Sequence, residues 1–168
     1  MGKFKGTVVA IGDLVAHAQA APEPDWAALY GSHRLRNDAA GAAAHCAWLV
    51  AEGDSLASCW RFGILQTVDY YDSAMRRGGV ELAGQVFARE PAPTGAVEVD
   101  AAFAALAEHL AVRDGWEPPV WSQDPARRTD RRWYVAQLPG FRAEADKQTP
   151  PAFGSRGVFI SANDLSRA

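Results

Sequence analysis

The sequence predicts a mainly α-helical fold, in which a compact helical bundle is crossed by an irregular segment and followed by a short C-terminal β element. Apolar residues recur at three- and four-residue spacing along several stretches, as in helices with one buried face. Tryptophans and prolines crowd residues 116–134, where proline makes regular structure hard to sustain. The run RGVFIS at residues 156–161 is β-branched and aromatic, which favours a strand.

Length and composition indicate one globular domain. The chain of 168 residues is expected to fold as a single helical domain over 1–168, with an N-terminal helical half (1–93) and a C-terminal helix plus strap (94–168). Its net charge of -3 excludes an overall positive field that would recruit nucleic acid or an anionic membrane. No apolar run approaches the length of about 18 residues that a membrane span needs.

Two helices are predicted before residue 31. The first has apolar residues at helical spacing, at Val8, Ile11, Val15 and Ala18. Because Gly12 and Asp13 interrupt the apolar run, this start is interpreted as structure and not as a signal peptide. The second helix follows a turn at 21–24, is capped by Asp25, and carries Trp26, Leu29 and Tyr30. With no secretory signal, the cysteines are expected to be reduced thiols in a cytoplasmic protein.

Two longer helices are expected to form a hairpin in the N-terminal half. Asp38 should cap the first, whose inner face is made of small residues, Ala42, Ala43, Cys46, Leu49 and Val50, that let a neighbouring helix approach closely. Asp54 should cap the second, which has the longest apolar stripe in the chain, from Leu56 to Met75. Gly78-Gly79 should end that helix. One more helix is indicated by Leu82, Val86 and Phe87.

The C-terminal half begins with an amphipathic helix. Its one buried stripe contains Val99, Phe103, Leu106 and Leu110. Thr94 or Asp100 is the expected N-terminal cap, and Gly115 should end the helix in a left-handed conformation. The strap, defined as residues 116–134, is expected to lie across the domain, because its large aromatic side chains would otherwise remain in water.

After the strap, local signals predict three short elements. Pro139 should open a helix that reaches about Lys147 and that Pro150 and Pro151 end. The strand at 156–161 follows. Asn163 or Asp164 is the expected cap of a last helical turn.

The chain contains no recognisable catalytic or metal-binding motif. The clustered soft ligands, His33, His45, Cys46 and Cys59, lack zinc-site spacing, and adjacent residues such as His45 and Cys46 point about 100° apart on a helix. No GxSxG motif or phosphate loop occurs. Asp69 and Asp72 could line a cleft, but a solvated helix face is the simpler interpretation. No metal and no cofactor are therefore predicted.

The candidate partner-binding residues lie in the second half of the strap and are Trp121, Arg127, Arg128, Arg131, Arg132, Trp133 and Tyr134. Arginine and large aromatic residues are the typical hot spots of protein interfaces. The same residue types can grip phosphates and stack on bases. A third interpretation is a solvated loop whose arginines pair locally with Asp124 and Asp130 or cover the tryptophans.

The C-terminal half also resembles known sequences. The runs DAAFAALAEHLAVRDGWEPPVW, DPARR, WY, FRAEAD and TPPAFGSRGVFISANDLSRA resemble the C-terminal region of uncharacterised bacterial proteins, among them helix-turn-helix regulators and antitoxin-like partners. The residues that carry the resemblance are Asp100, Leu106, Ala107, Leu110, Trp116, Pro119, Trp121, Pro125, Trp133, Pro151, Phe153, Arg156, Gly157, Phe159, Ile160 and Leu165. The resemblance covers under half the chain and implies a regulatory or toxin-neutralising role. The N-terminal half has no helix-turn-helix pattern, so DNA binding is not carried over.

Three hypotheses follow. The first is a non-catalytic interaction or regulatory module, such as the antitoxin-like partner of a toxin–antitoxin pair, which binds another protein through the strap and the Asp69–Asp72 surface. The second is a nucleic-acid-binding regulator that uses the loop 127–134. The third is an enzyme of an unrecognised type, although the sequence names no set of titratable groups for it.

Overall fold

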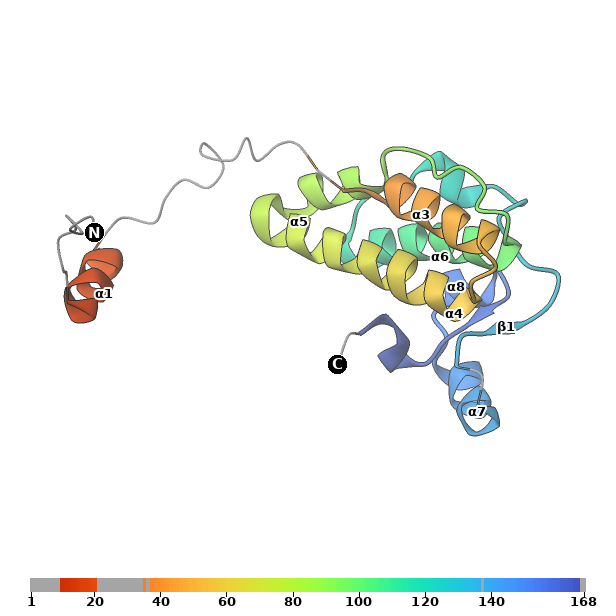
Figure 1. The fold of residues 1–168 in the computed structure, drawn as a ribbon. Coiled ribbons are helices and arrows are strands. Elements are labelled where there is room, and N and C mark those ends of the chain that lie inside the picture. Colours follow the sequence, from red (N-terminus) through yellow and green to blue (C-terminus); the bar gives the residue numbers. More distant parts are fainter. Residues whose placement is uncertain (1–9, 21–34, 36, 137, 167–168) are drawn as a thin grey trace, which may run out of the picture. The chain divides into compact units, whose positions relative to one another are not determined.

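A computed structural model describes residues 10–20, 35, 37–136 and 138–166 of the chain (Figure 1). The chain divides into two units, residues 1–32 and 33–168. In the first unit the structure describes helix α1 (Ile11–Ala20), on which Ile11 and Val15 are exposed. The predicted helix around Trp26 lies outside the described residues. A single domain over 1–168 stays a prediction.

The second unit is mainly helical, as predicted. Its elements, in order, are α3 (Ala39–Ala51), α4 (Leu56–Cys59), the π-helical turn η1 (Trp60–Ile64), α5 (Leu65–Gly84), η2 (Gln85–Phe87), α6 (Val97–Asp114), η3 (Val120–Gln123), β1 (Trp133–Tyr134), α7 (Pro139–Gln148), α8 (Pro151–Gly154), β2 (Val158–Phe159) and η4 (Ala162–Leu165). Among the described helices, none is both long and apolar enough to cross a bilayer.

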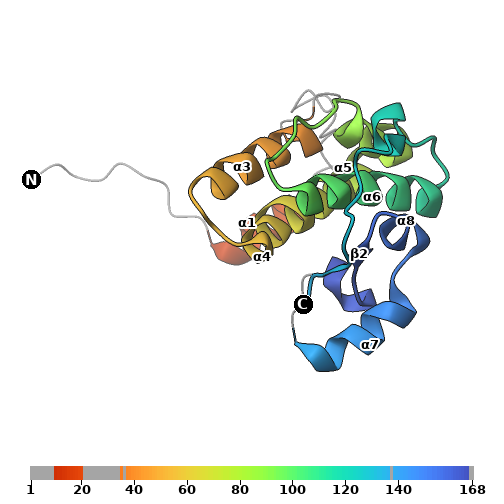
Figure 2. The same cartoon turned by 90° about the vertical axis from the view of Figure 1, so that its right-hand side faces the viewer.

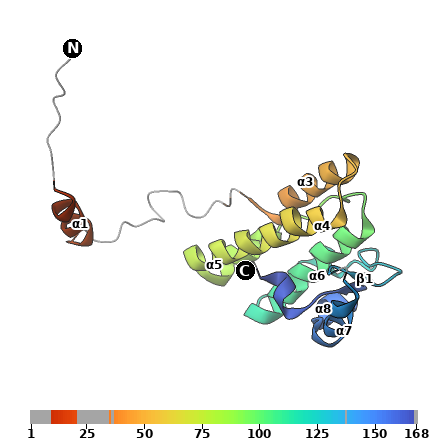
Figure 3. The ribbon, with the colours of Figure 1, turned by 60° about the horizontal axis from the view of Figure 1, so that its bottom comes forward.

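Helix α6 is the centre of this unit. It packs against α3, η1, η3 and α8, and Figures 2 and 3 show these elements around it. The prediction of one buried stripe is wrong in extent, because eight of the nine residues at 99–107 are buried and Asp100 alone is partly exposed. The alanines among them make this possible, since small side chains let neighbours close on several sides of a helix.

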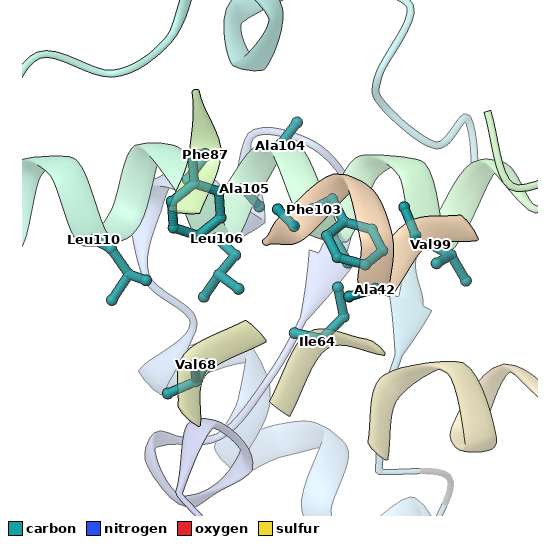
Figure 4. Close-up of a cluster of buried hydrophobic side chains, with 14 of the residues drawn as sticks. Ala42, Ile64, Val68, Phe87, Val99, Phe103, Ala104, Ala105, Leu106 and Leu110 are labelled. Atoms are coloured by element: carbon teal, nitrogen blue, oxygen red, sulfur yellow. The ribbon is translucent and has the colours of Figure 1, made fainter. Parts of the chain in front are cut away.

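The hydrophobic core lies between α6 and the hairpin formed by α3 and α5. Figure 4 shows Phe103 and Leu106 of α6 meeting Ile64 of η1, Val68 of α5 and Phe87 of η2. Phe103, Leu106, Ile64 and Phe87 are completely buried. Burial of side chains of this size contributes about 1.5–3 kcal/mol each, so this contact is the main source of stability for the unit.

The second helix of the hairpin is less regular than its pattern predicts. It begins at Ser55, which caps α4, so the predicted cap at Asp54 is wrong by one residue. It then passes through η1, where the buried Gly63 faces α3. A methyl group on Gly63 would overlap the sulfur of Cys46. The close approach of the two helices thus depends on the absence of a side chain at this position.

Several predicted helix ends are confirmed. Asp38 caps α3 by accepting a hydrogen bond of 2.7 Å from the Gly41 N–H. Gly115 ends α6 with φ 74°. Gly78 and Gly79 interrupt the helix with non-helical dihedral angles, although α5 as a whole continues to Gly84.

Other ends differ from the predictions. The cap of α6 is Ala96, without a side-chain bond, whereas the Asp100 carboxylate accepts hydrogen bonds from the N–H and the hydroxyl of Thr94. Ser161, and not Asn163 or Asp164, caps η4, and Asp164 completes the capping box. Pro139 opens α7 as predicted.

The predicted strand is much shorter than the run 156–161. Strand β2 pairs in parallel with β1, with Trp133 opposite Val158 and Tyr134 opposite Phe159. Gly157, with φ 78°, precedes this pair. The two-residue pair therefore serves to fix the end of the strap.

Substitution of Gly63 by alanine is expected to lower the free energy of unfolding by about 1–3 kcal/mol, because the new methyl group forces α3 and η1 apart. Urea denaturation of both proteins would measure this. Gly140→Ala is the matched control, since no atom lies within 4 Å of its added carbon.

In the double variant with Cys46→Ala, the loss should be smaller than the sum of the two single losses, because the smaller side chain makes room for the methyl group. Strictly additive losses would contradict this account of Gly63.

Candidate protein-interaction surface

The start of the strap is tied to α5 through a chain of hydrogen bonds. The indole N–H of Trp116 donates to the hydroxyl oxygen of Tyr71 at 2.8 Å, and the Tyr71 hydroxyl donates to Asp114 at 2.7 Å. Arg113 pairs with Asp114 at 2.8 Å and lies over the Tyr71 ring. Burial, together with the bond to Asp114, raises the pKa of Tyr71 to about 12. The hydrogen bond from Arg113 holds the pKa of Asp114 below its usual value.

The middle of the strap is held by Trp121 and Arg127. Trp121 is buried and donates from its indole nitrogen to the Phe87 carbonyl at 2.9 Å. The Arg127 guanidinium lies 5.2 Å from the centre of the Trp121 ring and donates from Nη2 to Glu90 and to the Pro91 carbonyl. Arg127 is only 7% exposed. Arg127, one of the candidate partner-binding residues, therefore faces inward.

A second buried arginine, Arg156, joins three segments. Its Nη2 donates to the Ser122 carbonyl of the strap and lies 2.6 Å from the Glu108 carboxylate of α6. Its Nη1 donates to the Ala152 carbonyl of α8 at 3.0 Å. The strap backbone adds a bond from the Thr129 N–H to the Arg156 carbonyl. Sequence reasoning missed this role, because nothing local marks Glu108 as the partner; the one available signal is an arginine beside an apolar run.

The end of the strap packs on the C-terminal elements. Trp133 contacts Trp60 edge to face, and the indole of Trp60 donates to the Asp164 carbonyl at 3.1 Å. The predicted packing of the strap tryptophans onto the helical body is confirmed at Trp116, Trp121 and Trp133.

Arg132 and Tyr134 turn toward α7. Arg132 lies over the Phe159 ring and pairs with Asp146 of α7 at 3.1 Å. The Tyr134 hydroxyl donates to the same carboxylate at 2.9 Å. Both side chains are partly committed to contacts within the chain.

The outer side of the strap includes Val120, Arg128 and Arg131. Val120 is 89% exposed, and both arginines are exposed. Within the part of the chain that the structure describes, the side chains of Arg128 and Arg131 have no ion pair or hydrogen bond. Of the seven candidate residues, the structure thus places these two arginines fully outward, whereas Trp121 and Arg127 face inward.

Two hollows flank η3 and share Gln123 and Asp124. The first has a volume of about 680 Å³ and is lined by Ala88, Glu90, Pro119, Val120, Trp121, Gln123 and Asp124. The second, of about 510 Å³, is lined by Glu108, Gln123, Asp124, Pro125, Arg127, Arg128, Ser155 and Arg156. The surface of the strap therefore has hollows as well as exposed side chains.

Other candidates from the sequence do not converge on a site. Asp72 lies 3.8 Å from Arg113, and Asp69 is half-buried with contacts of its own. Cys46 and Cys59 are buried free thiols, and burial raises the pKa of Cys46 to about 12. His33 lies outside the described residues, and no three His, Cys, Asp or Glu side chains within them form a metal-binding group.

Arg156→Met is expected to lower the free energy of unfolding by about 2–3 kcal/mol, because Glu108 and two backbone carbonyls lose a charged donor. Urea denaturation followed by tryptophan fluorescence would measure the loss. The matched variant Arg131→Met, on the exposed side of the same strap, should change stability by no more than about 0.5 kcal/mol. Equal losses in the two variants would contradict the role assigned to Arg156.

Asp114→Asn is expected to make the free energy of unfolding depend less strongly on pH in the acid range. Because the pKa of Asp114 is lower in the folded state than in the unfolded chain, its stabilisation is complete above about pH 5 and disappears as pH falls through the folded-state value. The stability difference between wild type and variant should therefore shrink from pH 7 toward about pH 2. Urea titrations over this range provide the measurement, and a constant difference would refute the expectation.

The chain matches no protein-family model, no curated protein and no solved structure. Functional inference accordingly depends on the geometry of its own residues, and the antitoxin-like resemblance stays a prediction.

Proposed function

We propose that the protein is a non-catalytic interaction module that presents the outer side of the strap to a protein partner, in a regulatory role such as that of an antitoxin-like protein. The observation that carries this proposal is that some side chains of the strap are buried in the fold while others face solvent. Its tryptophans and Arg127 serve the fold, whereas Val120, Arg128 and Arg131 remain exposed, and the side chains of the two arginines have no polar partner among the described residues. Arginine is among the residue types that are enriched at the centres of protein interfaces.

The local charge favours a protein partner over nucleic acid. Arg127 and Arg132 are each paired with a carboxylate. The two exposed arginines share their loop with Asp124 and Asp130, which are also exposed. Nucleic-acid affinity depends on cations that are free to displace counterions from successive phosphates. A loop with balanced charge has little such capacity, whereas mixed charges suit the specific pairing of protein interfaces.

The regulatory part of the proposal is supported by the resemblance of the C-terminal half to antitoxin-like and regulator-associated bacterial proteins. The residues that carry it include Trp116, Trp121, Trp133 and Arg156. In this chain these side chains hold the strap in place. The resemblance would then reflect a scaffold shared with those proteins, and the exposed residues would determine which partner binds.

The test is co-expression of the full chain with the products of the neighbouring reading frames, followed by size-exclusion chromatography with light scattering. Wild type is expected to form a stable complex with one of them. The double variant Arg128→Glu/Arg131→Glu should weaken that complex by about 100-fold or more, because like charges at an interface cost several kcal/mol.

The matched control is Arg76→Glu/Arg77→Glu, which reverses two exposed charges on α5. This variant should bind the partner as wild type does. Absence of any complex, or equal binding by both double variants, would refute the proposal. Retardation of DNA at low salt by wild type and not by the strap variant would support the nucleic-acid alternative instead.

A further inference from the structure

The two hollows beside η3 share two lining residues and differ in the chemistry of the others; together they are called the groove. They adjoin at Gln123 and Asp124, which line both. The first hollow is bordered by Val120, which at 89% is the most exposed of the large apolar side chains that the structure describes. The second is bordered by three arginines, Arg127, Arg128 and Arg156. A ligand that fills both ends must therefore be apolar in one part and polar in the other.

The guanidinium of Arg127 has unused donors at the second hollow. All of its hydrogen bonds leave from Nη2, to Glu90 and to the Pro91 carbonyl. Its Nε and Nη1 have no acceptor among the residues that the structure describes, although the side chain is only 8% exposed. The Trp121 ring covers a face of the guanidinium, but N–H donors point from its edge. Buried donors without acceptors are unfavourable, so this hollow is suited to a ligand that brings oxygen atoms.

The charges of the second hollow favour a single carboxylate. Two of the three arginines in its lining are paired, Arg127 with Glu90 and Arg156 with Glu108, whereas the side chain of Arg128 has no ion pair among the described residues. Glu108 is paired with Arg156, and Asp124 accepts a hydrogen bond from the Ala126 N–H. A carboxylate placed between Arg127 and Arg128 would pair with Arg128 and accept from the free donors of Arg127. A row of phosphates would instead meet the acidic side chains along the groove.

The first hollow suits an apolar side chain. Its apolar lining consists of Ala88, Pro119, Val120 and Trp121. Of its two acidic residues, Glu90 is paired with Arg127, and Asp124 accepts a hydrogen bond from the Ala126 N–H. Gln123, at the junction, is exposed and has no partner within the described ranges, so its amide is free to bond to a peptide backbone. In an extended chain alternate side chains point to the same face, about 7 Å apart, so an acidic and an apolar side chain two positions apart are the expected pair.

We infer that this groove binds a short extended segment of a protein partner, with an acidic side chain between Arg127 and Arg128 and a neighbouring apolar side chain against Val120 and Trp121. The inference rests on the proposed function and specifies the chemistry of the partner.

The experiment is a selection of displayed random ten-residue peptides against the full-length protein. Selected peptides are expected to contain Asp or Glu within two positions of a large apolar residue. In fluorescence anisotropy, changing that Asp to Asn, or that Glu to Gln, should weaken binding at least about tenfold, as expected for the loss of a charge-assisted hydrogen bond.

Variants of exposed groove residues test the site without disturbing the fold. Arg128→Gln and Val120→Ser should each weaken the selected peptide about tenfold or more. Their matched controls are Arg76→Gln on α5 and Val112→Ser on α6, where Val112 is 76% exposed, and these should bind as wild type does.

Three results would overturn the inference: no selected peptide, selected peptides without an acidic residue, or groove variants that bind like their controls. Displacement of the peptide by a single-stranded oligonucleotide at similar concentration would also overturn it. If the complex with a native partner forms and depends on the strap arginines, but Val120→Ser and Arg128→Gln leave it intact, the proposed function stands and the groove inference alone fails.

Discussion

The fold of the C-terminal half depends on the buried guanidinium of Arg156. This one group contacts the strap at the Ser122 carbonyl, α6 at Glu108 and α8 at the Ala152 carbonyl. A buried cation is tolerated only when its donors are satisfied and its charge is paired. These three segments therefore have little freedom to move apart independently, and the irregular strap is fixed as firmly as a regular element would be.

The helical body achieves close packing mainly through small residues. Buried alanines lie on several sides of α6, and Gly63 allows η1 to approach Cys46. Large side chains such as Phe103 and Phe87 then fill the space between the layers. The aromatic residues of the strap pack on this body. Their packing explains why a segment with almost no backbone hydrogen bonds of a sheet or helix is still well anchored.

Features that depend on local chemistry could be predicted from the sequence. Asp38, Gly115 and Pro139 mark helix ends through interactions within a few residues, and all three predictions are confirmed. The extent of burial around α6 could not be predicted, because it depends on which elements fold onto its alanines. The inward turn of Arg127 depends on Glu90 and Pro91, which are distant in the sequence, so its separation from Arg128 could not be predicted either.

The bond between the indole of Trp60 and the carbonyl of Asp164 spans 104 positions. Contacts of such long range cannot form until the later residue is available, and the ones that hold the strap at Arg156 share this dependence. During synthesis on the ribosome, the helical body can assemble first from residues up to α6. The strap can take its final shape only after β2 and η4 have emerged. The groove and the outward placement of its arginines are therefore among the last features of the structure to form.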